Sequence, residues 1–235
     1  MELNKYSDIK VSLIKSDDNY LDILSLAANI TMKKDFKDFN KDKIHKTIKF
    51  MLDADHTSVF EHINYTFLIE GASRSYLAQQ TRHRIASYTS GSQHYQNYED
   101  YSANVIDSLD PQLKKLYKES IERSIDDYKM LMELGMKKYE ARQVLPNGMQ
   151  NNLMITINAR SLINLFRLRL CYRATEEIRV VTTKMYNLCL NHFPELFQYI
   201  GPPCVMSNKC NQGKMTCGFT KAHIEKDLEL PKQKD

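Results

Sequence analysis

The sequence lacks the features of a membrane protein and of an exported protein. It contains no apolar run of about 18 residues, the length that an α-helix needs to cross a bilayer. Its first ten residues, MELNKYSDIK, have no apolar core of the kind found in secretory signal peptides. We therefore expect a cytoplasmic protein with no membrane partner.

Cysteine pairs with the short spacing of zinc sites are also missing. Among five cysteines, Cys204, Cys210 and Cys217 are separated by five and then six residues, and no C-x-x-C pair occurs. This spacing disfavours a zinc site. In a chain of this length, five cysteines fit reduced thiols better than a disulfide scaffold. We expect no bound metal, and thiols that stay free on the tail.

The excess of positive over negative charge in the sequence is small. The net charge of +4 suits a small anionic ligand and is too weak by itself to indicate a nucleic-acid partner. At 235 residues, one large domain is favoured over two small ones. We expect a single catalytic domain over residues 1–200, followed at 201–235 by a loosely structured tail rich in Cys, Pro and Lys.

Strand and helix patterns occur in separate segments. Alternation of apolar and polar residues predicts strands over 9–13, 62–70 and 153–157. Apolar residues at helical spacing predict helices over 41–53, 72–87 and 159–191. Asp110-Pro111 predicts the start of a further helix, and Gly135 its end. Strands scattered among long helices indicate an α+β fold.

The most informative segment is Arg82-His83-Arg84, followed after a short apolar step by a turn-prone run from Tyr88 to Ser92 that is rich in hydroxyls and backbone donors. Guanidinium groups bind oxyanions through paired hydrogen bonds, and small residues let backbone N–H groups approach them. The segment therefore predicts a site for a phosphorylated ligand. A basic surface corner is the simpler alternative.

A second informative segment is NARSLINLFRLRLCYR, residues 158–173. It is apolar nearly all round, which predicts a buried helix, yet it carries Arg160, Asn164 and Arg169. No acidic residue lies within one helical turn of Arg160 or Arg169, so an anionic ligand would satisfy them. Arg169 points about half a turn away from Arg160, and the helix could serve two sites in a homo-oligomer.

Together these segments resemble the flavin-dependent thymidylate synthases. The resemblance covers roughly residues 56–218 and consists of separate motifs in the family's order. They are HTSVFEH (56–62), SRSYLAQQTRHR (73–84) with Ser92 in an RHR-x7-S signature, EARQVLP (140–146) and NARSLINLFRLR (158–169). The tail GPPC…GKMTCG is similar to the C-terminal extension of some members.

The resemblance implies an enzyme that methylates dUMP to dTMP. One carbon comes from methylenetetrahydrofolate, and NADPH reduces the FAD cofactor. The implied fold is the family's α+β fold, with long helices and a small, mostly antiparallel sheet. The implied active unit is a homotetramer with FAD between protomers.

The resemblance also assigns site residues. FAD contacts are expected from residues matching Ser58, Arg82, His83, Arg84, Ser90, Asn158, Arg160 and Asn164. Nucleotide contacts are expected from residues matching Gln79, Arg82, Ser90, Gly91, Ser92, Gln93, His94, Arg142 and Arg169. Arg169 is also expected to act in catalysis, since a cation would stabilise negative charge on uracil as C5 becomes nucleophilic. Cys171 is disfavoured as a nucleophile, because no His lies near it in the sequence to activate it.

Three positions depart from the family pattern. Ser90 stands where many members have Glu or Gln, Asn29 where Arg is common, and His94 where the family usually has Arg. Because His is neutral at pH 7 unless perturbed, the change at His94 would weaken nucleotide binding or indicate another pyrimidine. A same-fold flavin enzyme that modifies another pyrimidine nucleotide, for example by hydroxymethylation, is therefore one alternative. A nucleic-acid-binding module built on the basic RHR segment is a more distant one.

Overall fold

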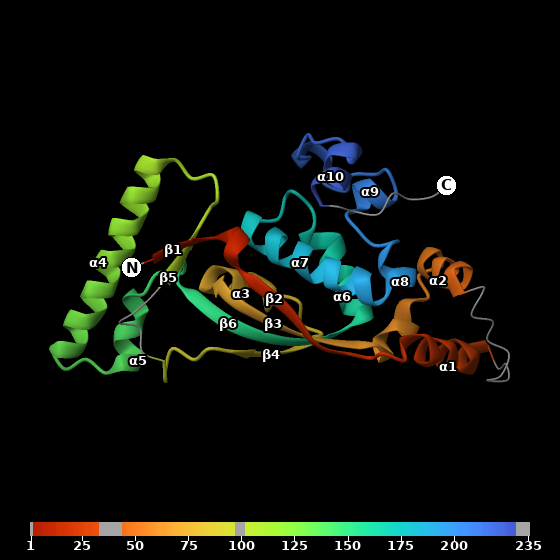
Figure 1. Ribbon diagram of the computed structural model, residues 1–235, viewed down its shortest axis with the longest axis horizontal. Helices are drawn as coiled ribbons and strands as arrows, with labels where there is room; N and C mark the ends of the chain where they lie inside the picture. Colours follow the sequence, from red (N-terminus) through yellow and green to blue (C-terminus); the bar gives the residue numbers. More distant parts are fainter. Residues whose placement is uncertain (1, 33–43, 97–101, 229–235) are drawn as a thin grey trace. The chain divides into compact units, whose positions relative to one another are not determined.

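The computed structural model describes residues 2–32, 44–96 and 102–228 (Figure 1). The chain divides into two compact units. Unit 1 consists of Met1–Val11, Leu68–Arg82 and Tyr88–Met154, and unit 2 of Ser12–Phe67, His83–Ser87 and Ile155–Asp235. Among the described helices, none is both long and apolar enough to cross a bilayer.

A four-stranded sheet has the strand order β2-β3-β6-β4. Its strands are β2 (Lys10–Ser16), β3 (Asn64–Ser73), β6 (Gln150–Asn158) and β4 (Ala86–Ser90). The Oγ1 atoms of Thr66 and Thr156 lie 3.0 Å apart, and the backbone N–H of Ala159 donates to Ile63. Residue numbers thus rise on one strand as they fall on the other, so β3 and β6 are antiparallel. Alternate side chains of both strands are buried, which confirms the predicted strands.

Unit 1 also contains a parallel pair of strands and a long helix. β1 (Glu2–Lys5) pairs with β5 (Ser102–Val105), and η1 (Tyr6–Asp8) follows β1. The long helix α4 (Pro111–Glu133) begins as predicted, because the Asp110 carboxylate accepts hydrogen bonds from the backbone N–H groups of Gln112 and Leu113. It ends before Gly135, whose φ of +93° suits glycine. The shorter elements are α3 (Arg74–Gln80), α5 (Lys138–Ala141) and η4 (Arg142–Val144).

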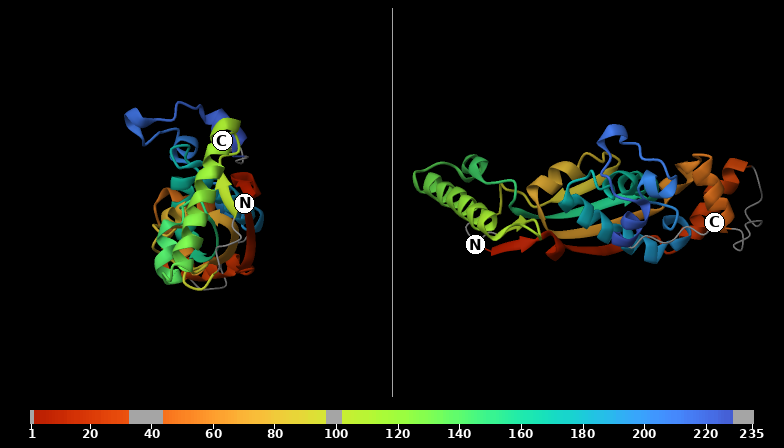
Figure 2. Two further views of the ribbon diagram at one scale, coloured as in Figure 1. Left: turned by 90° about the vertical axis from the view of Figure 1, so that its left-hand side faces the viewer. Right: turned by 90° about the horizontal axis from the view of Figure 1, so that it is seen from above.

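Unit 2 is mainly helical. Its elements are α1 (Tyr20–Met32), α2 (Ile44–Asp53), η3 (Thr57–His62), α6 (Ala159–Arg169), α7 (Glu176–His192), α8 (Pro194–Phe197), α9 (Pro203–Met206), η5 (Gly213–Met215) and α10 (Lys221–Asp227). Helices α6 and α7 lie side by side (Figure 2). Fully buried aromatic rings join them, with Phe166 and Tyr186 in edge contact at 5.4 Å between ring centroids. This core fixes the position of α6.

The predicted helix over 72–87 is wrong in its second half. Helix α3 ends at Gln80, and the hydroxyl of Thr81 donates to the carbonyl of Leu77 at 2.9 Å. The chain then turns, and Ala86–Ser90 forms strand β4. The RHR triplet therefore lies in the connection between α3 and β4. The run from Tyr88 to Ser92, predicted as a turn, is strand as far as Ser90 and turns only after it.

The single helix predicted over 159–191 is two helices. The chain turns at 170–175, where the backbone N–H of Ala174 donates to Cys171. Helix α7 restarts at Glu176-Glu177, and acidic residues favour the positive end of a helix. Arg169 is consequently the last residue of α6 rather than a residue in the middle of a helix.

The expected loose tail is wrong for the described part of it. Residues 203–227 contain α9, η5 and α10. The hydroxyl of Tyr172 donates to the Asp227 carboxylate, which connects α10 to the segment between α6 and α7.

Candidate active site

In unit 1, the predicted nucleotide residues Gly91 to His94 form an anchored turn. The backbone N–H groups of Tyr95 and Gln96 donate to the carbonyl of Ser92. The guanidinium of Arg74, on α3, donates to the carbonyl of Gly91 at 3.3 Å, and Gly91 in turn donates to Asn152 of β6 at 3.0 Å. The turn is thus held from both sides. Sequence reasoning missed Arg74, which lies inside one of the quoted motifs.

The same turn is brought beside the segment that contains Arg142. The ring of His94 stacks on Tyr139 of α5, with centroids 5.6 Å apart and planes inclined by 25°. Arg142 follows Tyr139 by three residues and is half-buried at the start of η4. Two motifs that are far apart in the sequence therefore meet, and Tyr139 is the residue that joins them.

A buried amide without a partner among the described residues lies next to this turn. A Cβ on Gly91 would lie 2.5 Å from Oδ1 of Asn151, so only glycine fits without displacement. Asn151 is 6% exposed, and neither polar atom of its side chain has a hydrogen-bond partner among residues 2–32, 44–96 and 102–228. In α3, the side-chain amide of Gln80 is likewise buried without a partner in the part of the chain that the structure describes. Unsatisfied buried amides are costly, so they suit a site that a polar ligand completes.

Gln79 and Arg82 remain neighbours although α3 ends between them. The backbone N–H of Arg82 donates to the carbonyl of Gln79 at 3.3 Å. Arg82 is exposed, and neither Arg82 nor Arg84 forms an ion pair with another described residue. Both guanidinium groups are therefore open to an anion.

In unit 2, His83 contacts the end of α6. Nε of Arg169 donates to Nε2 of His83 at 3.1 Å. Burial, and then the positive charge of Arg169, lower the pKa of His83 to about 4. The imidazole is therefore neutral at pH 7, with Nε2 as acceptor and the proton on Nδ1. The contact uses Nε, and within the described segments the terminal nitrogens of Arg169 have no hydrogen-bond partner, which leaves them for a ligand.

At the other end of α6, two predicted flavin residues already have structural partners. Oδ1 of Asn158 accepts from the backbone N–H of Ser161 at 2.9 Å and caps the helix. Arg160 forms an ion pair with Glu61 of η3, and its side chain is 48% exposed. The prediction that Arg160 is buried without an acidic partner is therefore wrong. Its partner is 99 residues away, beyond any search along one helix.

Helix α6 is amphipathic rather than apolar all round. Its buried residues are Ala159, Leu162, Ile163, Leu165 and Phe166. Arg160, Asn164 and Arg167 lie at helical spacing on an exposed face, and Leu168 is 53% exposed. Ser58 is exposed on η3, which packs against α6. Asn29, the departure in α1, is buried, and its Nδ2 has no partner among the residues that the structure describes.

These donors fit a flavin dinucleotide. Guanidinium groups match the oxygens of a diphosphate, and amides and hydroxyls match ring carbonyls and ribose. Ser58, Arg84, Arg160 and Asn164 are exposed in unit 2, and Nδ2 of Asn158 is not used by the helix cap. The side chains present are thus of the types that FAD requires.

Known proteins match most of the chain. Residues 12–195 match a family described as "Thymidylate synthase complementing protein". A flavin-dependent thymidylate synthase of Clostridium tetani is 32% identical, over 91% of this chain and 95% of that protein. One of Saccharolobus solfataricus is 37% identical, over 84% of this chain and 79% of that protein. The chain belongs to the flavin-dependent thymidylate synthase family.

A solved structure agrees on the fold. The UMP/dUMP methylase PolB from Streptomyces cacaoi, bound with 5-Br dUMP, has a TM-score of 0.75 at 23% identity, over 84% of this chain and 96% of that chain. The expected family, α+β fold, enzyme class and FAD cofactor are confirmed. The assignment of individual site residues stays a prediction.

The pKa of His83 predicts how the stability of the flavin-free protein depends on pH. Between pH 6.5 and about 4 the unfolded chain binds a proton that folded His83 does not. Stability should therefore fall as the pH is lowered through this window. His83→Gln cannot titrate, so its free energy of unfolding should fall less between pH 7 and pH 5. Urea unfolding of both proteins at the two pH values measures this, and parallel profiles would contradict the assignment.

Proposed function

We propose that this chain converts dUMP to dTMP, with methylenetetrahydrofolate as the carbon donor and NADPH as the reductant. The observation that carries the proposal is the hydrogen bond between His83 and Arg169. It joins the RHR motif to the end of α6 in a member of the flavin-dependent family. FAD, when bound, supplies the hydride chemistry and takes part in carbon transfer, while the protein binds and orients.

We assign the cofactor to the exposed donors described above. FAD is held by Ser58, Arg82, His83, Arg84, Ser90, Asn158, Arg160 and Asn164. Neutral His83 offers a hydrogen bond without adding charge, and the arginines offset the two negative charges of the diphosphate. The ion pair with Glu61 holds Arg160 beside η3 before the cofactor arrives.

The nucleotide belongs to the anchored turn. It is held by Gln79, Arg82, Ser90, Gly91, Ser92, Gln93, His94, Arg142 and Arg169. Backbone donors and small side chains in the turn suit a phosphate group. The stacking of His94 on Tyr139 places an imidazole where most members of the family have a guanidinium. In this proposal, the positive charge that binds the phosphate therefore comes from Arg82 and Arg142.

Arg169 has the catalytic role in this proposal. As C5 of uracil becomes nucleophilic, negative charge grows on N3 and its neighbouring carbonyl oxygen. A cation already fixed by His83 stabilises that charge without having to reorganise. His83 is a positioning residue for Arg169 in this step.

The direct test is product analysis with purified, FAD-loaded protein. We expect dTMP from dUMP, methylenetetrahydrofolate and NADPH. His94→Arg, which restores the family's usual residue, should lower the KM for dUMP and leave kcat little changed. No dTMP from the wild type together with dTMP from His94→Arg would favour the second candidate, an enzyme for another pyrimidine nucleotide. Absence of FAD binding on titration would contradict both.

We also propose a homotetramer, because α4 and the loop after it expose large apolar side chains. Leu113 and Leu116 are more than half exposed, as are Met130 and Leu134. Such a set suits burial against a second copy of the chain. Light scattering should give four chains of 27.5 kDa each, about 110 kDa. Leu116→Glu should lower that mass, whereas Lys118→Glu on the same helix should not, and a fully active monomer would contradict the proposal.

The remaining assignments complete the proposal. We place the enzyme in the cytoplasm, with neither nucleic acid nor membrane as a partner, and residues 1–200 as the catalytic domain with 201–235 as its tail. The modest net charge of +4 and the apolar packing of α6 support a small anionic substrate. A strong salt dependence of DNA binding would support the alternative of a nucleic-acid-binding module.

A further inference from the structure

The tail, residues 201–235, has no task in the catalytic proposal above. It lies outside residues 12–195, the part of the chain that matches the family. Its described part is nonetheless folded, since α9 packs against α10 and Ile224 of α10 is 2% exposed. The contacts of this folded tail with the rest of unit 2 indicate what it does.

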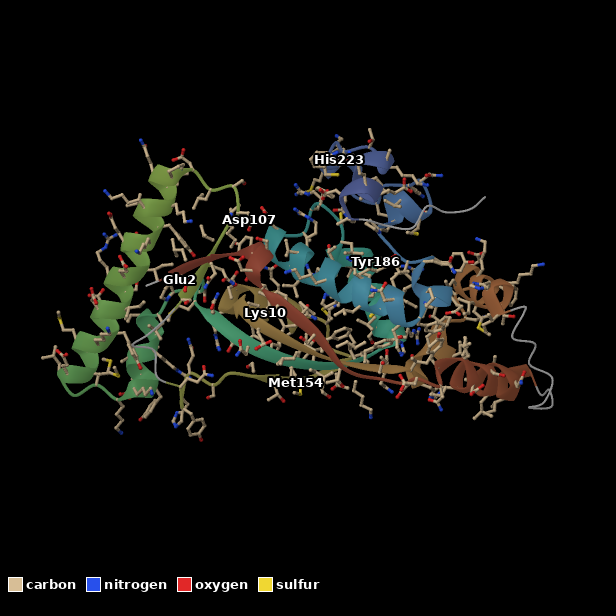
Figure 3. The ribbon with its side chains drawn as sticks, in the orientation of Figure 1. Glu2, Lys10, Asp107, Met154, Tyr186 and His223 are labelled. Carbon is tan, nitrogen blue, oxygen red and sulfur yellow. The ribbon has the colours of Figure 1, made fainter. Side chains whose placement is uncertain are left out.

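The tail meets the turn that follows α6 at Tyr172. The ring of Tyr172 lies 4.8 Å from that of Phe219, between centroids. His223, labelled in Figure 3, stacks on Phe219 at 4.5 Å with planes inclined by 11°. The hydroxyl of Tyr172 donates to the carboxylate of Asp227 in α10. Two parts of the tail thus hold one side chain of the turn.

Helix α7 holds the same side chain. The guanidinium carbon of Arg179 lies 4.5 Å from the centroid of the Tyr172 ring, which is a cation–π contact. Burial, and then the hydrogen bond to Asp227, raise the pKa of the Tyr172 hydroxyl, so this group stays protonated and able to donate. Tyr172 is consequently fixed both by its ring and by its hydroxyl.

The turn itself has few hydrogen bonds of its own. The backbone N–H of Ala174 donates to the carbonyl of Cys171. The backbone N–H groups of residues 171–173 have no hydrogen-bond partner within the described segments. The conformation of the turn therefore depends on contacts from outside it, and those of Tyr172 are of this kind.

Arg169 depends on this turn because it is the last residue of α6. Helix ends fray, so a terminal residue is held less firmly than one in the middle of a helix. The turn begins at the next residue, and Tyr172 lies three residues beyond Arg169. A fixed Tyr172 therefore opposes fraying of the helical turn whose guanidinium donates to His83.

We propose that the tail is a clamp that positions Arg169 for catalysis, with Tyr172, Phe219 and Asp227 as its positioning residues. The inference rests on the catalytic role proposed above for Arg169. In that role the guanidinium is fixed before charge develops on the pyrimidine, because a cation that must first reorganise stabilises that charge less. The clamp acts through the turn after α6 and contacts neither substrate nor cofactor.

The first part of the test is steady-state kinetics at saturating dUMP. Phe219→Ala and Asp227→Ala should lower the kcat of dTMP formation by roughly tenfold or more, because a small displacement of a catalytic group has an effect of this order. Both variants should bind FAD like the wild type. Asp227→Asn keeps an acceptor for the Tyr172 hydroxyl and should retain most of the wild-type kcat. Lys226→Ala, the matched control, removes an exposed side chain from the same helix and should retain it too.

The second part measures the pKa of His83 by NMR of histidine-labelled protein without flavin or substrate. Burial, and then the positive charge of Arg169, lower this pKa to about 4. A loosened Arg169 should therefore raise the pKa of His83 in Phe219→Ala and Asp227→Ala, and Lys226→Ala should leave it unchanged. His83→Gln identifies the resonance.

Two results would overturn the proposal. One is wild-type kcat in both Phe219→Ala and Asp227→Ala. The other is a pKa of His83 that is the same in these variants as in the wild type, since the tail would then act elsewhere than on Arg169. The pKa is measured without substrate. If the wild type forms no dTMP, the proposed function fails, while a raised pKa of His83 in the two variants still supports the clamp.

Discussion

Arg169→Ala should fold, retain FAD and oxidise NADPH, yet form dTMP at roughly one hundredth of the wild-type rate or less, even at saturating dUMP. The expected loss is large because this guanidinium is fixed by His83 and leaves its terminal nitrogens for charge that develops during the reaction. Neither water nor a mobile lysine replaces a cation fixed in this way. Steady-state kinetics with product analysis, alongside flavin absorbance of the purified variant, measures the effect.

Arg167→Ala is the matched control, since it removes an exposed guanidinium from the same helix. It should keep most of the wild-type kcat. His83→Gln should lie between the two, because it loosens Arg169 without removing it. If Arg169→Ala raises only the KM for dUMP and leaves kcat unchanged, then Arg169 binds substrate and transition state equally, and the catalytic assignment is wrong.

Arg82→Ala should weaken FAD binding more than tenfold, the equivalent of about 1.5–3 kcal/mol for a lost charge-assisted contact. Asn164→Ala should weaken it in the same direction, since its exposed amide is a predicted flavin contact on α6. Titration of flavin-free protein with FAD, followed by fluorescence quenching, measures both constants. Arg123→Ala removes an exposed guanidinium from α4 and controls for the loss of one positive charge. Wild-type affinity in both Arg82→Ala and Asn164→Ala would contradict the assigned flavin site.

Local signals in the sequence predicted much of the fold. Alternation identified β3 and β6, and Asp110-Pro111 identified the start of α4, because a strand face and a helix cap each involve only a few neighbouring residues. The turn between α6 and α7 was missed, since apolar residues continue at helical spacing through it. Strand β4 was missed because it is stabilised by pairing within the sheet rather than by its own pattern.

The site was predictable in its residue types and not in its contacts. The motifs named His83 and Arg169, yet the hydrogen bond between them joins residues 86 positions apart. The partner of Arg160 is similarly remote, and the inference that Arg160 lacks an acidic partner therefore failed. Tyr139 and Asn151 carry no chemistry that a motif would mark. They matter because the fold places Tyr139 against His94 and Asn151 against Gly91.

The helix cap at Asn158 limits what mutations can reveal about flavin binding. One amide has two tasks, with Oδ1 holding the first turn of α6 and Nδ2 directed to the cofactor in our proposal. Asn158→Ala would lose both, and about 0.5–2 kcal/mol of lost capping would be mistaken for lost affinity. Asn158→Asp keeps the acceptor and replaces the Nδ2 donor with an anionic oxygen, which cannot donate to the cofactor and repels its diphosphate. A single conservative exchange can thus separate the folding of α6 from its recognition of the cofactor.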